Sequence, residues 1–229
     1  MAGAMTRAMI LAAGRGERLR PYTDHLPKPL LEVGGKPLIV RHLESLAAAG
    51  VREVIINIGH LGDLIVERLG HQWRGLRIIY SDERSGRLET GGALIRALPQ
   101  LGDAPFLLVN GDICTDFPWD SLLQPSLASV YLVLVPNPSH HPAGDFALNA
   151  GMVALQGEER HTYAGIARIN PALLRGYPEQ SAPLAPWLRQ WIAAGVVEGT
   201  LYQGIWTDVG TPERWQVAQE ICRVRQDGI

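Results

Sequence analysis

The sequence predicts an α/β fold in which a mainly parallel central sheet is covered by helices on both faces. Short uninterrupted apolar runs, such as "AMILAA" (8–13) and "APFLLVNGD" (104–112), are typical of strands buried on both sides. Amphipathic segments alternate with these runs, as the crossover connections between parallel strands require. From about residue 137 to 169 the runs become shorter and carry glycine turns, which predicts hairpins inserted beside the main sheet. We therefore expect a three-layer sandwich with a small hairpin lobe.

The first half of the chain alternates strand and helix signals. Strands are expected at 8–13, 52–59, 76–82 and 104–112, and helices at 37–50, 61–70 and 91–102. Leu38, Ile39, Leu43 and Leu46 share one face of the helix at 37–50, and Gly50 is the glycine expected just past its end.

The second half contains fewer helices. Strands are expected at 128–136 and 201–210, with strand-like pieces at 146–155 and 162–169, and helices at 185–195 and 211–226. Thr211 is a suitable N-cap for the last helix, and Pro212 suits its first position. The sequence has no repeat, low-complexity tract or linker, so we expect a single domain over 1–229.

Composition excludes several classes of function. The 229 residues are 46% hydrophobic and 19% charged, as in globular enzymes and unlike disordered or fibrous chains. A net charge of −2 gives no field that would hold a nucleic-acid polymer. No membrane span or signal peptide is indicated, and Cys114 and Cys222 lack metal-binding spacing, so we expect two small apolar residues in a reducing cytoplasm. Nothing in the sequence indicates an oligomeric state.

The stretch "LAAGRGERLRPYTDHLPKPL" (11–30) follows the first expected strand. It is not a dinucleotide fingerprint, because Leu19 stands where a third glycine is needed, and the chain has no P-loop motif. Its glycines nevertheless offer backbone N–H groups to phosphates. Lys28 lies between two prolines, so its charge is presented from a stiff segment. The alternative is a surface loop of solvated arginines.

Polar residues follow several of the expected strands. In parallel sheets the ligand crevice lies at the carboxyl ends of the strands, and Gly14, Ser81, Asp82 and Asp112 occupy such ends. Asp208 ends the last expected strand. Mg²⁺ takes few protein oxygens and fills its other positions with water and phosphate, so two such carboxylates would suit it. A turn residue is the alternative interpretation of each aspartate.

The stretch at 11–30 resembles the signature of sugar-1-phosphate nucleotidyltransferases, LAAGxGxRLxPxTxxxPKPL, at every specified position. The resemblance implies a Rossmann-like fold with a nucleotide-binding core (1–136), a sugar-binding lobe (137–205) and a last segment with the metal-site strand and C-terminal helix (206–229). It implies a nucleoside triphosphate and a sugar-1-phosphate as substrates and Mg²⁺ as cofactor. The implied catalytic residues are Arg18, Lys28 and Asp112, and the implied metal ligands are Asp112 and Asp208.

The implied nucleotide-binding residues are Leu11, Ala13, Gly14, Arg15, Gly16, Glu17, Ser81, Glu89, Thr90 and Gly91. The segment "LETGG" (88–92) falls where the family recognises the base, and many members have glycine where this chain has Glu89. "LETGG" and "NPSHHPAGDF" (137–146) are similar to the N-acetylmuramate-1-phosphate uridylyltransferases of bacterial cell-wall recycling. This similarity implies UTP and N-acetylmuramate α-1-phosphate as substrates. The alternatives are a guanylyltransferase for mannose- or heptose-1-phosphate and a regulatory, non-enzymatic nucleotide-sugar-binding paralogue.

The candidates for binding the sugar are Asn110, Asp145, Tyr163, Gly165 and Trp206, each of which could instead pack the lobe. Some relatives hold the sugar phosphate with the lysine of an EKP-type motif, but this chain has no lysine between 148 and 169, so another group must replace it. We assign no catalytic role to His140 and His141, which we expect in a turn near Pro138 and Pro142.

Overall fold

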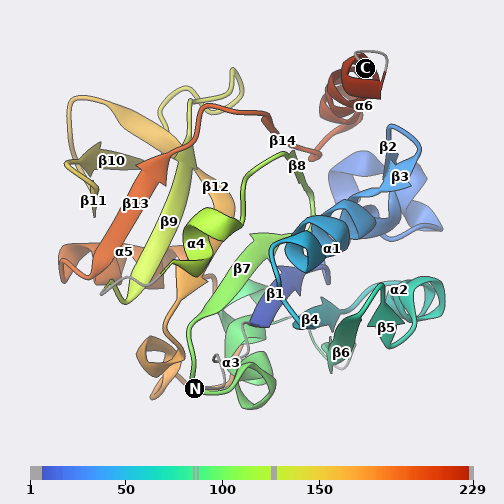
Figure 1. Cartoon of the computed structure of the whole chain (residues 1–229), viewed down its shortest axis with the longest axis horizontal. Helices are drawn as coiled ribbons and strands as arrows, with labels where there is room; N and C mark the ends of the chain where they lie inside the picture. Colours follow the sequence, from blue (N-terminus) through green and yellow to red (C-terminus); the bar gives the residue numbers. More distant parts are fainter. Residues whose placement is uncertain (1–6, 85, 87, 125–127, 227–229) are drawn as a thin grey trace.

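The N-terminal half forms the parallel part of the main sheet (Figure 1). The computed structural model describes residues 7–84, 86, 88–124 and 128–226. Four strands pair in parallel in the order β7 (Phe106–Asn110), β1 (Arg7–Leu11), β4 (Glu53–Ile58) and β6 (Leu76–Asp82). A short antiparallel strand, β5 (Gln72–Trp73), closes this edge. All six residues of β4 are buried, which explains why the central strands are continuous apolar runs.

The C-terminal half continues the same sheet, largely in antiparallel fashion. From β7 the order is β12 (Arg160–Ile169), β9 (Val130–Val135), β13 (Val197–Leu201), β11 (Met152–Ala154) and β10 (Phe146–Asn149). Only the pair of β13 with β9 is parallel among these described strands. The expected hairpin is present, since β10 and β11 pair across the turn at 150–151, but it extends the edge of the main sheet and does not lie beside it. Residues 164–167 of β12 are all buried, and a strand buried in this way needs hydrogen-bonded neighbours on both edges.

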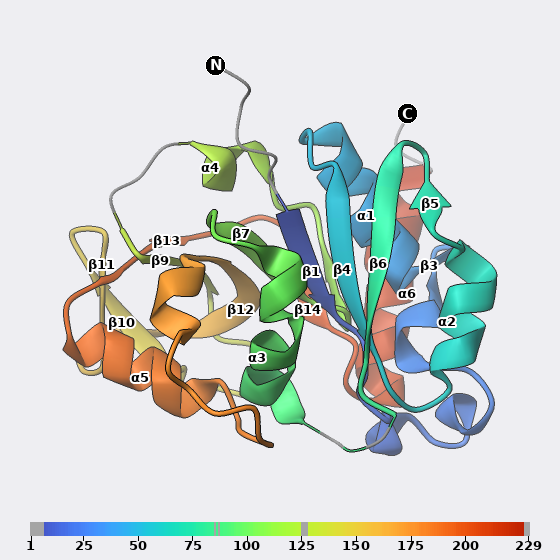
Figure 2. The ribbon, with the colours of Figure 1, turned by 90° about the horizontal axis from the view of Figure 1, so that it is seen from below.

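Helices cover both faces of the sheet, as the predicted three-layer arrangement requires. Alternate residues of β1 face opposite layers: Ala8 and Ile10 pack with α1 (Leu38–Ala48), α2 (Gly62–Leu69) and α4 (Asp120–Leu123). Met9 packs with α3 (Glu89–Leu101) and α5 (Ala185–Ala193). Figure 2 shows α3 and α5 on one side of the strands and α1 and α2 on the other.

The last expected strand, at 201–210, is interrupted in the structure. β13 ends at Leu201, and the chain bends through Gly204, where a side chain would collide with the Tyr202 ring. It then forms β14 (Trp206–Asp208), which leaves the main sheet and pairs with β8 (Ile113–Thr115). The bend places Asp208 beside the segment that carries Asp112.

The helix α6 (Pro212–Gln226) begins as predicted, since the Arg214 amide donates to Thr211 Oγ1 at 3.4 Å. It packs on the loop after β1 through a small apolar cluster that includes Leu19, Val209 and Ala218. In α1 the four predicted core residues are fully buried, and Gly50 has φ +92 just past the helix end. The remaining short elements are η1 (Glu17–Leu19), η2 (Tyr22–Asp24), η3 (Lys28–Leu30), β2 (Glu32–Val33), β3 (Lys36–Pro37) and η4 (Pro171–Leu174).

The two cysteines, distant in sequence, are neighbours in space. The Sγ atoms of Cys114 in β8 and Cys222 in α6 lie 3.5 Å apart as free thiols. Burial raises the pKa of Cys114 to about 12, so its thiol stays protonated at neutral pH. No helix in the described part of the chain is long and apolar enough to span a membrane.

Candidate active site

A cavity of about 550 Å³ lies at the carboxyl ends of β1, β4, β6 and β7, where the parallel arrangement predicts a ligand crevice. Each strand end contributes residues to its wall, and the loop after β1 contributes the most. The lining residues are Leu11, Ala12, Ala13, Gly14, Arg15, Gly16, Lys28, Pro29, Asn57, Gly59, His60, Glu83, Arg84, Gly86, Glu89, Thr90, Asn110, Gly111 and Asp112.

The glycine loop is held in a fixed shape. Gly16 has φ +65, and a Cβ there would lie 2.8 Å from Thr23 Cγ2. The Thr23 hydroxyl donates to the Gly16 carbonyl at 2.8 Å. Gly14 and Arg15 line the cavity, whereas Glu17 and Arg18 are exposed and do not line it. The loop therefore presents backbone groups and one arginine to a ligand in the cavity.

Lys28 has the restricted placement that its flanking prolines predict. Its side chain is only 11% exposed, and its ammonium group pairs with Asp112. Pro27 is extended, with ψ 140, and Lys28 begins the short helix η3. The cation thus stands between the glycine loop and the end of β7.

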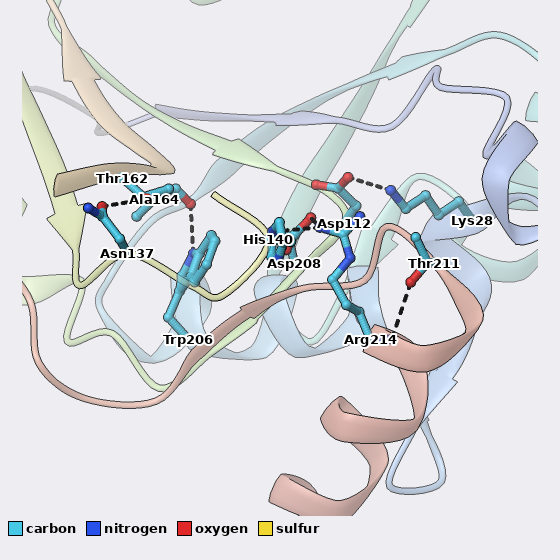
Figure 3. A network of polar contacts seen from close by, with 10 residues as sticks. All are labelled: Lys28, Asp112, Asn137, His140, Thr162, Ala164, Trp206, Asp208, Thr211 and Arg214. Atoms are coloured by element: carbon cyan, nitrogen blue, oxygen red, sulfur yellow. Dashed lines mark hydrogen bonds and ion pairs between the residues drawn. The ribbon is translucent and has the colours of Figure 1, made fainter. Parts of the chain in front are cut away.

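Asp112 and Asp208 come together because β8 and β14 are paired. Asp208 lies opposite Ile113, and the Val209 amide donates to the Asp112 carbonyl at 2.7 Å. Figure 3 shows both carboxyl groups in one polar network, with Arg214 on Asp208 and Lys28 on Asp112. Asp208 Oδ1 is buried and makes no hydrogen bond in the described part of the chain.

These two carboxylates fit a divalent cation. Both can supply oxygen ligands from adjacent backbone segments, and the buried Asp208 Oδ1 makes no hydrogen bond to any described residue and lies 3.2 Å from His140 Nε2. Few protein ligands are typical of Mg²⁺, which binds through one or two carboxylates together with substrate phosphates.

The other end of the cavity is acidic. The Asn57 side chain accepts from the Ala12 amide at 2.6 Å and donates to Glu83 Oε1 at 2.8 Å. Burial raises the pKa of Glu83, and the hydrogen bond from Asn57 opposes this rise. Arg84 lines this end as well and pairs with Asp82 and Asp63. Neither Glu83 nor Asn57 is predicted from the sequence, although Asn57 is a polar residue in the apolar run "VIINI", which is a signal for a hydrogen-bonded side chain.

The expected nucleotide contacts at the start of α3 divide into two groups. Glu89 and Thr90 line the cavity. Gly91 is buried elsewhere, since a Cβ there would lie 2.8 Å from the Ala182 carbonyl oxygen and 2.9 Å from the Trp187 ring. In the structure Gly91 therefore packs against this segment, whereas the sequence predicts that it contacts the nucleotide. Ser81 is also buried and does not line the cavity; Glu83 reaches it instead.

Three of the sugar candidates lie side by side. Gly165 has φ +73, and a Cβ there would lie 2.6 Å from Asn110 Nδ2. The Trp206 indole N–H donates to the Ala164 carbonyl at 2.9 Å. Asn110, Gly165 and Trp206 thus meet where β7, β12 and β14 approach each other, next to Asp112.

The other two sugar candidates hold the lobe together. Asp145 accepts from the Tyr163 amide at 2.8 Å and lies 3.1 Å from His141 Nε2. The Tyr163 ring packs against the core cluster on the α3 and α5 side, and burial raises the pKa of its hydroxyl. Its side chain therefore points into the core, unlike the predicted sugar contact.

The turn at 138–141 forms as expected, with the His141 amide donating to the Pro138 carbonyl at 2.9 Å. Its two histidines diverge, because His140 approaches Asp208 and Arg214 while His141 approaches Asp145. A third histidine, His42 of α1, is buried behind Asp112, and burial lowers its pKa to about 4. His42 is therefore neutral at pH 7.

Known proteins resemble this chain over nearly its whole length. It is 44% identical to N-acetylmuramate alpha-1-phosphate uridylyltransferase of Neisseria meningitidis serogroup B, with 94% of this chain and 98% of that protein covered. It is 35% identical to the Caulobacter vibrioides protein of the same name, with 90% and 92% covered. The solved structure of HddC from Yersinia pseudotuberculosis, complexed with GMP-PN, has the same fold, with a TM-score of 0.79, 22% identity and 95% and 99% coverage.

Residues 7–146 match the sequence model of the family described as nucleotidyl transferase. This range contains the glycine loop, Lys28, the acidic end of the cavity and Asp112. On this match and the identity with full-length relatives, the chain belongs to the nucleotidyl transferase family.

Proposed function

We propose that this protein transfers the uridylyl group of UTP to N-acetylmuramate α-1-phosphate, giving UDP-N-acetylmuramate and pyrophosphate. The similarity to relatives named for this activity supports the choice of substrates. The observation that carries the chemistry is the meeting of Lys28 and Asp112 beside the glycine loop, at one end of a cavity large enough for a nucleotide. We place the reaction in the cytoplasm, in the recycling of peptidoglycan.

The reaction is an in-line displacement. An oxygen of the sugar phosphate forms a bond to the α-phosphorus of UTP. The bond from that phosphorus to the oxygen that bridges it to the β-phosphorus breaks, and this oxygen keeps the electron pair and leaves as part of pyrophosphate. The second pKa of a phosphate monoester is about 6, so the attacking group is mostly a dianion at neutral pH and needs no general base. The protein's contribution is therefore to hold two anions together and to offset their charge.

We assign the triphosphate to the cationic end of the cavity. The backbone of Gly14 to Gly16 would receive its phosphates, with Arg15 and Lys28 supplying positive charge in the cavity wall and Arg18 supplying it from the exposed side of the same loop. The base would lie toward Glu83, Glu89 and Thr90 at the other end. The sugar would lie against Asn110, Gly165 and Trp206, one residue from each of the three segments 1–136, 137–205 and 206–229, while the nucleotide-binding residues all lie within 1–136.

We propose Mg²⁺ as the cofactor, held by Asp112 and Asp208. When bound, the ion offsets negative charge on the phosphates during displacement. Asp112 is aligned for this role by Lys28, and Asp208 by its place in β14.

A substrate panel tests the proposal. Purified protein is given UTP or GTP with N-acetylmuramate α-1-phosphate or mannose-1-phosphate, and pyrophosphate release is followed. Fast turnover is expected for UTP with N-acetylmuramate α-1-phosphate; preference for GTP with mannose-1-phosphate would make the protein a guanylyltransferase, and no turnover with any pair would favour the regulatory paralogue.

A variant tests the metal site in the same assay. Asp112→Asn should still bind UTP but lose at least about 100-fold in turnover, because one charged cation ligand is gone. Asp103→Asn is the matched control, since Asp103 is an exposed aspartate paired with Arg175 at the surface. Near wild-type turnover by Asp112→Asn would refute the metal assignment.

A further inference from the structure

Arg214 places a positive charge beside Asp208, on the side of the site that lies outside the cavity. It lies in the first turn of α6, its side chain is only 15% exposed, and its guanidinium pairs with Asp208. Neither Arg214 nor Asp208 lines the cavity that we assign to the nucleotide. Both lie beyond Asp112, in the network that also contains Trp206 (Figure 3).

The residues just before Arg214 determine where its guanidinium lies. Gly210, between β14 and α6, lies directly under it, and a side chain at that position would collide with Arg214 Nη2. Thr211 caps the first turn of α6 by accepting from the Arg214 amide. The glycine and the cap together fold the arginine back over the end of β14.

His140 supports the same arrangement from the lobe. Arg214 Nη1 lies 2.7 Å from His140 Nε2. The same Nη1 donates to Asp208 Oδ2, so His140 and Asp208 hold one edge of the guanidinium from two sides. His140 Nε2 also lies 3.2 Å from Asp208 Oδ1.

The incoming sugar phosphate needs a cation that the lysines cannot provide. The chain has two lysines. Lys28 stands at the nucleotide end on Asp112, and Lys36 pairs with Glu44 at the start of α1. A phosphate dianion approaching from the lobe side therefore has to be met by an arginine or a histidine, and Arg214 is the arginine that touches Asp208 there.

We propose that Arg214 binds the phosphate of the sugar-1-phosphate substrate and sets its position for attack. The inference rests on the proposed function and adds the residue that receives the second substrate. The guanidinium has a planar fork of N–H donors that matches phosphate oxygens in pairs. Asp208 and His140 hold this fork in place before the substrate arrives, so little side-chain freedom is lost on binding.

Steady-state kinetics of two variants test the inference. Arg214→Gln should raise KM for N-acetylmuramate α-1-phosphate by roughly 10- to 100-fold, the range expected for losing hydrogen bonds to a charged group, with KM for UTP changed less than about twofold. Arg214→Lys, which keeps the charge but not the fork, should fall between wild type and Arg214→Gln. Arg175→Gln, a surface arginine paired with Asp103, is the control and should match the wild type.

An equilibrium measurement separates binding from a merely structural effect. The sugar phosphate is titrated into each protein saturated with α,β-methylene UTP, which cannot be turned over, and the unfolding temperature is recorded in parallel. Weaker sugar-phosphate binding by Arg214→Gln with unchanged affinity for the analogue supports the inference. Unchanged sugar-phosphate binding, or equal loss for both ligands, overturns it. Absence of turnover by the wild type with this sugar phosphate would instead refute the proposed function itself, and the inference with it.

Discussion

Replacing His42 should remove a pH-dependent part of the free energy of unfolding. His42 lies on α1 and is only 3% exposed, and burial lowers the pKa of its imidazole from 6.5 to about 4. The charged groups that face it are Asp112, which raises the pKa, and Arg41, which lowers it. His42 is uncharged when folded at pH 5, whereas in the unfolded chain it is mostly protonated.

The sign and size of the effect follow from the two pKa values. Above pH 6.5 both states hold a neutral imidazole, so the titration costs nothing. As the pH falls from 6.5 to about 4 only the unfolded state gains a proton, and stability is lost throughout this window. Between about pH 7.5 and pH 5 the loss is about 2 kcal/mol, and below the folded pKa it grows no further.

Urea unfolding of the wild type and His42→Leu at these two pH values measures the effect. The leucine variant should lose about 2 kcal/mol less than the wild type on acidification, because other titrating groups contribute equally to both proteins. Leu46→Ala, which removes a fully buried side chain of the same helix, controls for general destabilisation and should keep the wild-type difference. An equal loss on acidification in wild type and His42→Leu would refute the reasoning.

Two further variants test features of the cavity wall. Glu89 has φ +56, a backbone conformation that favours glycine. Glu89→Gly should therefore raise the free energy of unfolding, measured by urea titration, by roughly 0.5–1 kcal/mol. The control is Glu67→Gly on the exposed face of α2, which should lower the free energy of unfolding by about as much. A loss of stability in Glu89→Gly would contradict the strain argument. Asn57→Leu leaves the Ala12 amide and Glu83 without their hydrogen-bond partner. The variant should lower the free energy of unfolding by roughly 1–3 kcal/mol in the same titration and should raise KM for UTP. If both the free energy of unfolding and KM stay at their wild-type values, this network has no such role.

The parallel part of the fold could be predicted closely because its signals are local. β6 spans the predicted residues 76–82, and α1 buries the four predicted side chains. The pairing of the C-terminal strands could not be predicted, since it depends on which edges remain free after folding. β12 fills the gap between β7 and β9, a choice that no short sequence pattern records.

The candidate site shows the same division. The glycine loop and Lys28 are encoded in consecutive residues, and their placement in the cavity agrees with the sequence pattern. Gly91 packs against the segment at 182–187, about ninety residues away, and no local sequence pattern records this contact. Glu83 and Asn57 were missed because a hydrogen bond across neighbouring strands gives them their importance.

The polar network also explains how two carboxylates can lie on adjacent segments before any substrate binds. Asp112 and Asp208 would repel each other, and each is offset by a basic residue from a different part of the chain. Lys28 comes from the loop after β1, and Arg214 comes from the last helix. The family match ends at residue 146, yet Asp208 and Arg214 lie beyond it. The proposed site therefore depends on the packing of α6 against the N-terminal loop as well as on the pairing of β8 with β14, because Leu19, Val209 and Ala218 share one apolar cluster beside it.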